Sequence, residues 1–349
     1  MTKKKIALLF GGCSSEYEVS LQSAAAVMQH IDMERYELFP LGITRSGEWF
    51  LYDGSPANIA DDSWSADPGL IRAVISPDRQ TRGIVAFSQK STMTIRLDAA
   101  FPLLHGKNGE DGTVQGLLEL AGIPIIGCTT LASALCMDKD MAHKLVEAAG
   151  IQIPASFVIR NDSRFEENMQ QAASLSYPLF VKPARAGSSF GITKVMQEDA
   201  LREAVLNAFE YDQKVIVEQA VDGFEVGCAI MGTESLVVGE VDEVELSRGF
   251  FDYTEKYTLQ SSKIHMPARL GKADAQRVKD AAVTVYRALE CSGLARVDFF
   301  FTPAGDIVFN EVNTIPGFTA HSRFPTMMKG IGLSFGEILD HLIGTAVTP

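Results

Sequence analysis

The sequence predicts an α/β protein that begins with a doubly wound α/β domain, and three neighbouring features support this prediction. The segment Lys5–Phe10 is an unbroken apolar run, which is typical of a buried parallel strand. A glycine pair follows it as a turn. Ser15 and Glu18 then have the spacing of a capping box, which predicts a helix running to about His30. A strand, a turn and a helix in this order are typical of doubly wound sheets.

The chain has 349 residues, which is enough for one to three domains with a full core. It is 46% hydrophobic and its net charge is −13, so we expect neither nucleic acid nor an anionic membrane as its main partner. No apolar run approaches the roughly 20 residues of a membrane span, and the first run is too short for a secretion signal. These features predict a cytoplasmic protein. The five cysteines are scattered, so neither a disulfide framework nor a zinc site is expected.

The rest of the first domain, residues 1–127, contains further predicted strands and one surface excursion. The excursion, Asp53–Pro77, is rich in Asp, Ser, Pro and Gly, which is typical of a variable surface segment. The strands are expected at Tyr36–Gly42, near Ile84–Phe87, and at Ala99–Leu104 and Ile123–Gly127.

Two loops follow strands of this domain, at the edge where open α/β sheets bind ligands. The first loop offers Glu16, either as a ligand-binding acid or simply as a helix cap. The second loop, HGKNGEDGTVQG, extends from His105 to Gly116 and leads into a helix from about Thr113. Several glycines and charges directly after a strand indicate a functional loop.

The second domain, residues 128–228, is predicted to begin with a helix over Leu131–Ala149. Its side chains Lys139 and Lys144 are candidate phosphate contacts, although a solvated lysine face would look the same. The later elements of this domain are strands at Pro154–Val158, Tyr177–Pro183 and Lys214–Glu218, and a helix at Asp199–Phe209.

Lys182 ends one of these strands, and a loop of glycines and serines over residues 187–191 follows it. Flexible glycines allow backbone N–H groups to close around phosphates, and the lysine supplies positive charge. The loop also matches G-x-S-x-G, the nucleophile elbow of α/β-hydrolases, but that motif needs a helix after the serine. The following segment, ITKV, is β-branched and predicts a strand. We therefore predict a flap over a nucleotide.

Two acids lie near the end of the second domain. Glu218 ends a strand and Glu225 begins the next, which suits contacts to an adenine and a ribose, although buried or capping acids would look alike. In the third domain, residues 229–349, Gly249–Pro267 is a long aromatic and basic loop, as is typical of a lid. Helices are expected at Asp274–Leu289 and Ser334–Ile343.

The third domain is also expected to contain a hairpin, in which Val297–Phe301 and Ile307–Phe309 flank a turn. Asp298 opens the first strand, while Glu311 and Asn313 point the same way from the second because strand side chains alternate. Two carboxylates and an amide oxygen would then converge, a set that suits Mg²⁺ with waters and nucleotide phosphates as its other ligands. The alternative is a hairpin with solvated polar ends. The segment that follows, residues 319–332, is expected to be a loop.

Two of these motifs, HGKNGEDGTVQG and residues 296–317, resemble the signature segments of the D-alanine–D-alanine ligases of the ATP-grasp superfamily. KIALLFGGCSSEYEVS, ASALCMDK, VKPARAGSSFG, VIVEQ and DYTEKY resemble further blocks of that family, in the family's order. The resemblance covers nearly the whole chain. It implies an ATP-grasp fold with an N-terminal α/β substrate domain, a central domain with a flap, and a C-terminal domain with a lid loop and a metal site.

The resemblance also implies a reaction. ATP would phosphorylate the carboxylate of a first D-alanine, and the amine of a second D-amino acid would attack the acyl phosphate, releasing ADP and phosphate. Two Mg²⁺ ions, with Mn²⁺ as an alternative, and a homodimer are implied as well. The family's metal ligands match Asp298, Glu311 and Asn313, and its nucleotide contacts match Lys139, Lys182, Glu218, Glu225 and Lys256.

The remaining implied roles concern the two substrates and the oxyanion. Preorganised donors stabilise an oxyanion, and Arg296 with the backbone N–H of Gly317 matches that role. In the family, the acid that holds the first substrate's ammonium is linked by hydrogen bonds to a serine and to a lid tyrosine; these match Glu16, Ser188 and Tyr257. His105 matches a residue near the first substrate, and Ser322 matches one that holds the second carboxylate.

Two departures bear on the second substrate. Arg323 stands where simple D-alanine ligases usually have an apolar residue, and Phe251 stands where many of them have Tyr. Both departures resemble the vancomycin-resistance ligases that make D-alanyl-D-serine. An arginine close to the second subsite could reach a hydroxymethyl group, directly or through water. The lid keeps Tyr257 without a neighbouring histidine, which argues against D-lactate. The resemblance therefore implies D-alanine and D-serine as substrates in peptidoglycan precursor synthesis, with a housekeeping D-alanine–D-alanine ligase as the alternative.

Other classes are disfavoured by the same motifs. A different carboxylate–amine ligase of the superfamily would need the ATP motifs without HGKNGEDG and SSEYE, and both are present. A non-catalytic nucleotide-binding module would be expected to lose Arg296, Glu311 or Lys182, and the chain keeps all three.

Overall fold

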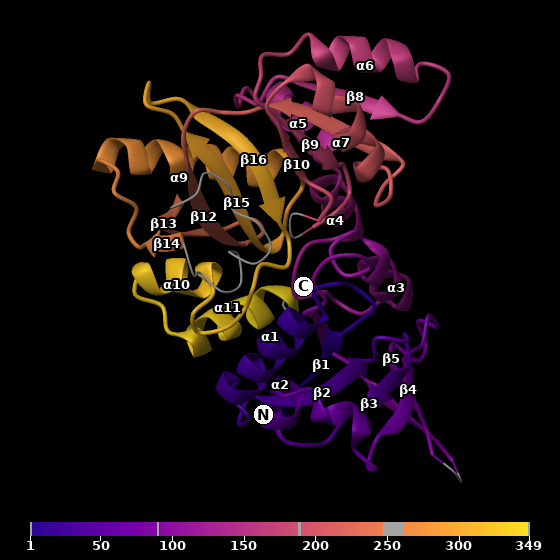
Figure 1. Cartoon of the computed structure of the whole chain (residues 1–349). Helices are drawn as coiled ribbons and strands as arrows, with labels where there is room; N and C mark the ends of the chain where they lie inside the picture. The colour runs from indigo at the N-terminus through magenta and orange to yellow at the C-terminus, as the bar shows by residue number, and fades with distance from the viewer. Residues whose placement is uncertain (1, 89–90, 188–189, 247–261, 348–349) are drawn as a thin grey trace.

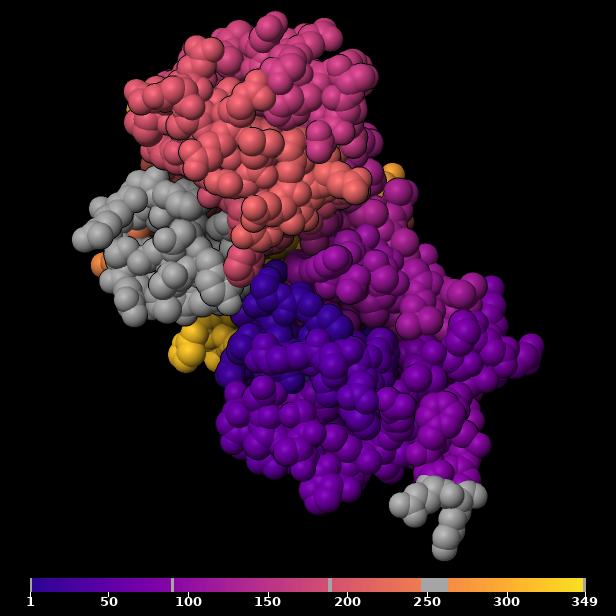
Figure 2. All heavy atoms as spheres, turned by 45° about the vertical axis from the view of Figure 1, so that its right-hand side comes forward, coloured from indigo at the N-terminus to yellow at the C-terminus, as the bar shows by residue number. Residues whose placement is uncertain are grey.

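The computed structural model describes residues 2–88, 91–187, 190–246 and 262–347. Within these ranges the chain forms three β-sheets, of seven, four and five strands, with helices packed against them (Figure 1). Figure 2 shows the unit around the second sheet as a lobe at one end of the molecule and the unit around the first sheet at the other. This arrangement confirms the predicted α/β class.

The first sheet has the strand order β6-β5-β4-β3-β2-β1-β7. Strand β1 (Lys4–Gly11) is buried from Ile6 onward, as its apolar run predicts. It pairs in parallel with β2 and β7, whereas the pairs from β2 to β6 are antiparallel, so the doubly wound part is limited to three strands. The other strands are β2 Tyr36–Ile43, β3 Trp49–Leu51, β4 Ile71–Ile75, β5 Gly83–Phe87, β6 Thr92–Arg96 and β7 Ala99–Pro102.

The prediction that Asp53–Pro77 is a variable surface excursion is wrong, because the segment contains regular elements and is anchored in the core. This segment contains helix α2 (Pro56–Ala60), the 3₁₀-helix η1 (Ser63–Ala66) and strand β4. Trp64 in η1 is fully buried, and its ring packs edge-on against Phe10 at 4.8 Å between centroids. One large aromatic side chain thus anchors a segment whose composition is otherwise polar.

The predicted capping box is also wrong, although helix α1 (Tyr17–His30) is present. Glu16 is the N-cap residue, and no side chain caps this helix end. Instead, the Glu16 N–H donates to Ser14 Oγ at 3.1 Å. The loop conformation is therefore fixed by Ser14 rather than by Ser15.

Two other predictions need correction at the end of the first unit. The predicted strand Ile123–Gly127 makes only an isolated bridge to β7, and it follows helix α3 (Thr113–Ala121). The single helix predicted at Leu131–Ala149 is two helices, α4 (Thr130–Met137) and α5 (Lys139–Ala148). The backbone leaves the helical region at Asp138 (φ −87°, ψ 98°), because the Asp138 side chain caps α5 by accepting the Met141 N–H.

The second sheet has the order β10-β9-β11-β8, and its pairs are antiparallel. Thr193 of β10 pairs with Val181 of β9, so a strand follows the glycine loop, as predicted, and a hydrolase elbow is excluded. The elements are β8 Ser156–Arg160, α6 Phe165–Ala173, β9 Leu179–Pro183, β10 Thr193–Val195, η2 Glu198–Ala200, α7 Leu201–Ala208 and β11 Lys214–Gln219.

The third sheet has the order β14-β13-β12-β15-β16. The domain boundary predicted at residue 228 falls inside β12, which belongs to this sheet along its whole length.

The prediction of a loop at residues 319–332 is wrong, since helix α10 occupies most of this segment. Pro325 is tolerated in the first turn of α10, where N–H groups have no helical partner. The elements are β12 Phe224–Gly232, β13 Leu236–Leu246, β14 Ser262–His265, α9 Lys272–Ala288, β15 Gly293–Phe301, β16 Ile307–Asn313, α10 Arg323–Gly330 and α11 Phe335–Val347.

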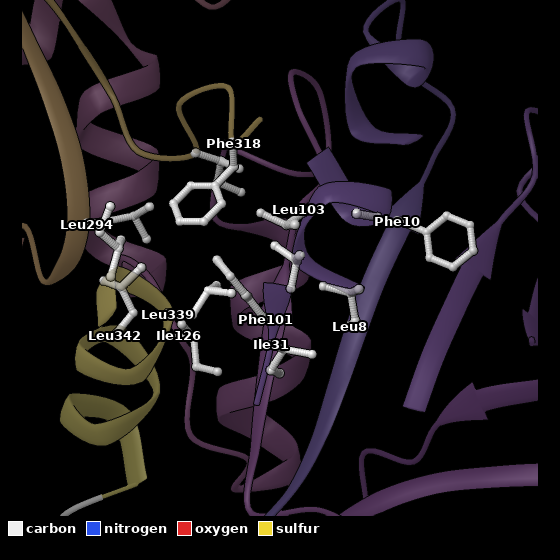
Figure 3. Close-up of a cluster of buried hydrophobic side chains, with 14 of the residues drawn as sticks. Leu8, Phe10, Ile31, Phe101, Leu103, Ile126, Leu294, Phe318, Leu339 and Leu342 are labelled. Atoms are coloured by element: carbon white, nitrogen blue, oxygen red, sulfur yellow. The ribbon is translucent and has the colours of Figure 1, made fainter. Parts of the chain in front are cut away.

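The first and third units share one hydrophobic core. Figure 3 shows Leu8 and Phe101 of the first sheet facing Leu339 and Leu342 of α11. Phe318, in the link between β16 and α10, is fully buried in the same core. The segment that follows the hairpin is therefore held between the two units.

Candidate active site

The β15–β16 hairpin brings the three predicted metal ligands together. Asp298 lies opposite Glu311 in the register, and a β-bulge follows directly after this pair. Asn313 Nδ2 donates to Asp298 Oδ2 at 2.9 Å. Asp298 is buried, whereas Glu311 and Asn313 are partly exposed. Two carboxylates and an amide at one point are a hard-oxygen donor set, which fits a magnesium ion.

Arg296 lies at this point as well. Its Nε lies 2.9 and 3.0 Å from the two oxygens of Asp298, and its Nη2 lies 2.8 Å from Oδ2. Burial alone would lower the pKa of Arg296, but the charge of Asp298 raises it above its usual value. The guanidinium is thus a permanent cation beside the paired acids, where negative charge from phosphates or an oxyanion would be stabilised.

Arg323, the first residue of α10, is buried against the third sheet and is not a surface side chain. It donates from Nε and Nη2 to the two oxygens of Asp242, and from Nη1 to Glu225 at 2.9 Å. Nη2 also lies 3.3 Å from Asp298 Oδ1. Burial alone would lower the pKa of Arg323, but Asp242 and Asp298 raise it well above its usual value. This guanidinium therefore links the predicted ribose contact to the predicted metal ligand.

A second set of charged groups lies between β9, β11 and the start of α5. Lys182 Nζ contacts Glu218 Oε2, and Lys139 Nζ donates to the carbonyl of Ala186 at 3.0 Å and lies 3.8 Å from Glu311 Oε2. Burial raises the pKa of Glu218, but the charge of Lys182, followed by that of His143, outweighs it and lowers the pKa. Lys139 thus connects the loop after β9 to the hairpin acid Glu311, while Lys182 connects β9 to Glu218 of β11.

One atom in this set tests whether a nucleotide fits. Glu218 is buried, yet its Oε1 accepts no hydrogen bond from the described residues, and His143 Nε2 lies 3.8 Å away. A buried carboxylate oxygen without a donor is costly unless a ligand supplies one. An amino group or hydroxyl of a nucleotide would do so, and the neighbouring lysines suit its phosphates.

Lys139 is held in place by an ion cluster that the sequence did not reveal. The buried Lys214 Nζ lies 2.6 Å from Asp138 Oδ1 and 2.7 Å from Asp140 Oδ2, which fastens the first turn of α5 to β11. Lys144 pairs with Asp140 at 2.8 Å on the surface and is not directed at the lysines of the flap. Of the two candidate lysines in α5, the structure therefore places only Lys139 with Lys182 and Glu311.

Glu16 lies where the first and second units meet. It is buried, and a β-carbon at Gly106 would approach its Oε2 to 2.5 Å, while one at Gly187 would approach it to 2.9 Å. The two glycines thus allow the signature loop of the first unit and the loop of the flap to close around this acid. His105 is buried beside it, and burial lowers the pKa of this histidine.

Gly317 and Ser322 are neighbours in the segment between the hairpin and α10. A β-carbon at Gly317 would lie 3.1 Å from Ser322 Oγ, which in turn accepts the Thr319 N–H at 3.1 Å. The predicted oxyanion donor and the predicted carboxylate contact therefore lie side by side. Ser188, Phe251, Lys256 and Tyr257 lie outside the described residues.

Two residues that hold the site's charged groups in place were missed by the sequence analysis. Asp242 lies in a segment where acidic and apolar residues alternate, a pattern that predicts a solvent-exposed face for the acids. Lys214 is the first residue of an ordinary apolar strand. Nothing local distinguishes these residues, because their partners lie far away in the chain.

A fold of three units in which Lys139 and Lys182 lie with Glu218 and Glu311 fits an ATP-dependent ligase of the ATP-grasp type. Family models described as D-ala D-ala ligase N-terminus and C-terminus match residues 5–128 and 145–344. The chain therefore belongs to the D-alanine–D-alanine ligase family, and it is an ATP-dependent enzyme that uses a divalent metal ion.

Individual relatives support this assignment. The vancomycin B-type resistance protein VanB of Enterococcus faecalis is 45% identical over 353 residues, which cover 99% of each chain. The D-alanine–D-alanine ligase of Caldicellulosiruptor bescii is 44% identical over 99% of this chain and 96% of its own. The crystal structure of the VanG D-Ala:D-Ser ligase from Enterococcus faecalis has a TM-score of 0.93 and 57% identity, covering 99% of this chain and all of that one. None of the helices in the described ranges is long and apolar enough to cross a bilayer.

Proposed function

We propose that this enzyme joins D-alanine to D-serine, with a residual D-alanine–D-alanine activity. When bound, ATP supplies the phosphoryl group that activates the carboxylate of the first D-alanine, and two Mg²⁺ ions, or Mn²⁺ in their place, offset the phosphate charge. Asp298, Glu311 and Asn313 would hold the metal. Lys139, Lys182 and Lys256 would hold the phosphates, and Glu218 and Glu225 the nucleoside.

The other side chains would bind and orient the two substrates. Glu16 would hold the ammonium group of the first D-alanine, with His105 beside it, and the resemblance to the family assigns Ser188 and Tyr257 to the same site. Arg296 and the Gly317 N–H stabilise the oxyanion that forms when the second amine attacks. Ser322 would bind the second carboxylate, and the resemblance to the family assigns Phe251 to the second subsite. The amine loses its proton and phosphate leaves, which gives a peptide bond.

The observation that favours D-serine is the position of Arg323. Its guanidinium lies beside Asp298, and Nη1 carries a second N–H besides the one given to Glu225. A hydroxymethyl group can use this donor, directly or through water, and a methyl group cannot. The similarity to VanG, whose structure is described as a D-Ala:D-Ser ligase, agrees with this reading.

We further propose that the enzyme is a cytoplasmic homodimer in peptidoglycan precursor synthesis and contributes to vancomycin resistance. A plain D-alanine–D-alanine ligase is the second candidate, since such ligases are among its relatives.

The test is to measure ADP release by the purified protein with Mg²⁺, ATP and D-alanine, with and without D-serine, followed by analysis of the products. A dominant mixed dipeptide is expected. D-alanyl-D-alanine alone would overturn the D-serine preference and leave the second candidate. The absence of ADP release with either substrate would overturn the ligase reading.

A further inference from the structure

The segment that carries Gly317 is bound by the first unit at three backbone groups. The Ile315 N–H donates to Glu110 Oε1 at 3.2 Å, and the Ile315 carbonyl accepts from His105 Nδ1 at 2.8 Å. The Phe318 N–H donates to Ser23 Oγ at 3.2 Å. We refer to Ser23, His105 and Glu110 as the N-terminal clamp. Its contacts lie on both sides of Gly317.

Glu110 fastens two loops at once. Its Oε2 accepts the Gly106 N–H at 2.8 Å, while Oε1 accepts the N–H of Ile315, which is 205 positions further along the chain. Each oxygen of the carboxyl group faces a backbone donor, and both oxygens keep an acceptor lone pair whether or not the group is protonated. A side chain with only one acceptor oxygen would therefore leave one of these two N–H groups unbound.

His105 and Ser23 form a directional link. A carbonyl only accepts, so His105 Nδ1 carries the proton given to Ile315, and burial lowers the pKa of the ring and keeps it neutral. Nε2 then accepts from Ser23 Oγ at 3.0 Å, and Ser23 Oγ accepts the Phe318 N–H. The direction of each of these three hydrogen bonds is fixed, which leaves little freedom for the segment at residues 315–318.

Packing reinforces the clamp. The fully buried Phe318 ring lies 5.6 Å from Phe101 of the first sheet, between centroids, and faces the core shown in Figure 3. Gly317 has no side chain of its own to fix its conformation. The direction of its N–H is therefore set by the neighbours that the first unit holds.

We propose that Glu110 is a positioning residue that, with His105 and Ser23, holds the Gly317 N–H in the orientation used by the ligation step. The proposal rests on the function proposed above. It predicts that damage to the clamp impairs attack on the acyl phosphate more than formation of the acyl phosphate, because the oxyanion forms only in the second step.

The experiment compares Glu110→Gln with Glu119→Gln as a matched control. Glu119 is an exposed acid of the same unit whose Oε1 accepts one backbone N–H, from Thr130 at 2.9 Å. Positional isotope exchange at the β,γ-bridging oxygen of ATP reports acyl-phosphate formation, and dipeptide release reports the whole reaction. In Glu110→Gln we expect dipeptide release to fall by roughly 10- to 100-fold and isotope exchange by less than about 3-fold. An equal loss of both, or no loss, would overturn the proposal.

Amide hydrogen exchange supplies a readout that does not depend on activity. Exchange across residues 315–318 should be roughly 10-fold faster in Glu110→Gln and unchanged in Glu119→Gln. Unchanged exchange in both would overturn the clamp even in an active enzyme. If the wild type makes no dipeptide, the proposed function falls, while hydrogen exchange still decides whether the clamp exists. Ser23→Ala, which removes the contact to Phe318, should repeat both effects if Glu110→Gln does not fold.

Discussion

Arg323 and Asp242, 81 residues apart in the chain, form a two-pronged ion pair with both contacts at 2.7 Å. Asp242 is 0% exposed and Arg323 is 9% exposed. A buried charge depends strongly on its partner, because water cannot replace it. A residue that selects the second substrate would therefore also fasten α10 to strand β13 of the third sheet.

Replacing Arg323 with Met should change both specificity and stability. We expect the product ratio to shift from D-alanyl-D-serine toward D-alanyl-D-alanine, since the donor for the hydroxymethyl group is lost. The free energy of unfolding should fall by about 3–5 kcal/mol, because Asp242 remains buried without its partner. Product analysis in mixed substrate and chemical denaturation measure the two effects.

The double variant Arg323→Met with Asp242→Leu is the control for this prediction. Removing both charges should recover much of the lost stability while leaving the shift toward D-alanine in place. An unchanged product ratio in a folded single variant would show that Arg323 has only a structural role.

Replacing Glu311 with Gln should nearly abolish turnover. The amide keeps the shape of the side chain but removes the charge that would bind the metal. A loss of at least about 4 kcal/mol of transition-state stabilisation, or about 10³-fold in kcat, is expected. Glu234→Gln, at an exposed position in the turn between β12 and β13, is the matched control. A Glu311→Gln enzyme with near-normal kcat at saturating Mg²⁺ would contradict the metal assignment.

Glu110 should make the stability of the ligand-free protein depend on pH. Burial, followed by the charge of Glu16, raises the pKa of Glu110 from 4.5 to about 8. The protonated form thus contributes stability that is complete below pH 4.5 and is lost as the pH rises through about 8. Denaturation of wild type and Glu110→Gln between these limits should show their difference falling with pH. Parallel curves would contradict the shift.

The cysteines should differ sharply in reactivity. Cys13 is exposed, whereas Cys128, Cys136, Cys228 and Cys291 are buried. Burial raises the pKa of Cys228, and the contact with Cys291 followed by burial raises that of Cys128, so thiolate is scarce at both. Iodoacetamide at pH 8 should alkylate Cys13 alone in the native protein and all five cysteines in denaturant, as read by mass spectrometry. Labelling of a buried cysteine without denaturant would contradict this.

The hairpin could be predicted from the sequence because its information is local. Two apolar runs, a turn and alternating side chains determine that Asp298 and Glu311 share a face, and the structure places them opposite each other. The strand after the glycine loop was predictable for the same reason, because β-branched residues disfavour the helix that a hydrolase elbow would need.

What could not be predicted depends on distant contacts or on a single side chain. The break between α4 and α5 comes from one capping residue, Asp138, inside a run of good helix formers. The polar segment around Trp64 is ordered because one ring fills a space beside Phe10. Arg323 was singled out from the sequence, but its partner Asp242 was not, since an ion pair across 81 residues has no local pattern.

The last helix of the chain has a consequence for synthesis on the ribosome. Leu339 and Leu342 of α11 complete the core that begins with Leu8 of β1, as Figure 3 shows. Proteins made from independent units can fold each one as it emerges. Here the first unit keeps an open apolar face until α11 has been translated. Its final packing therefore waits for the synthesis of α11, and the nascent chain must keep that face from aggregating in the meantime.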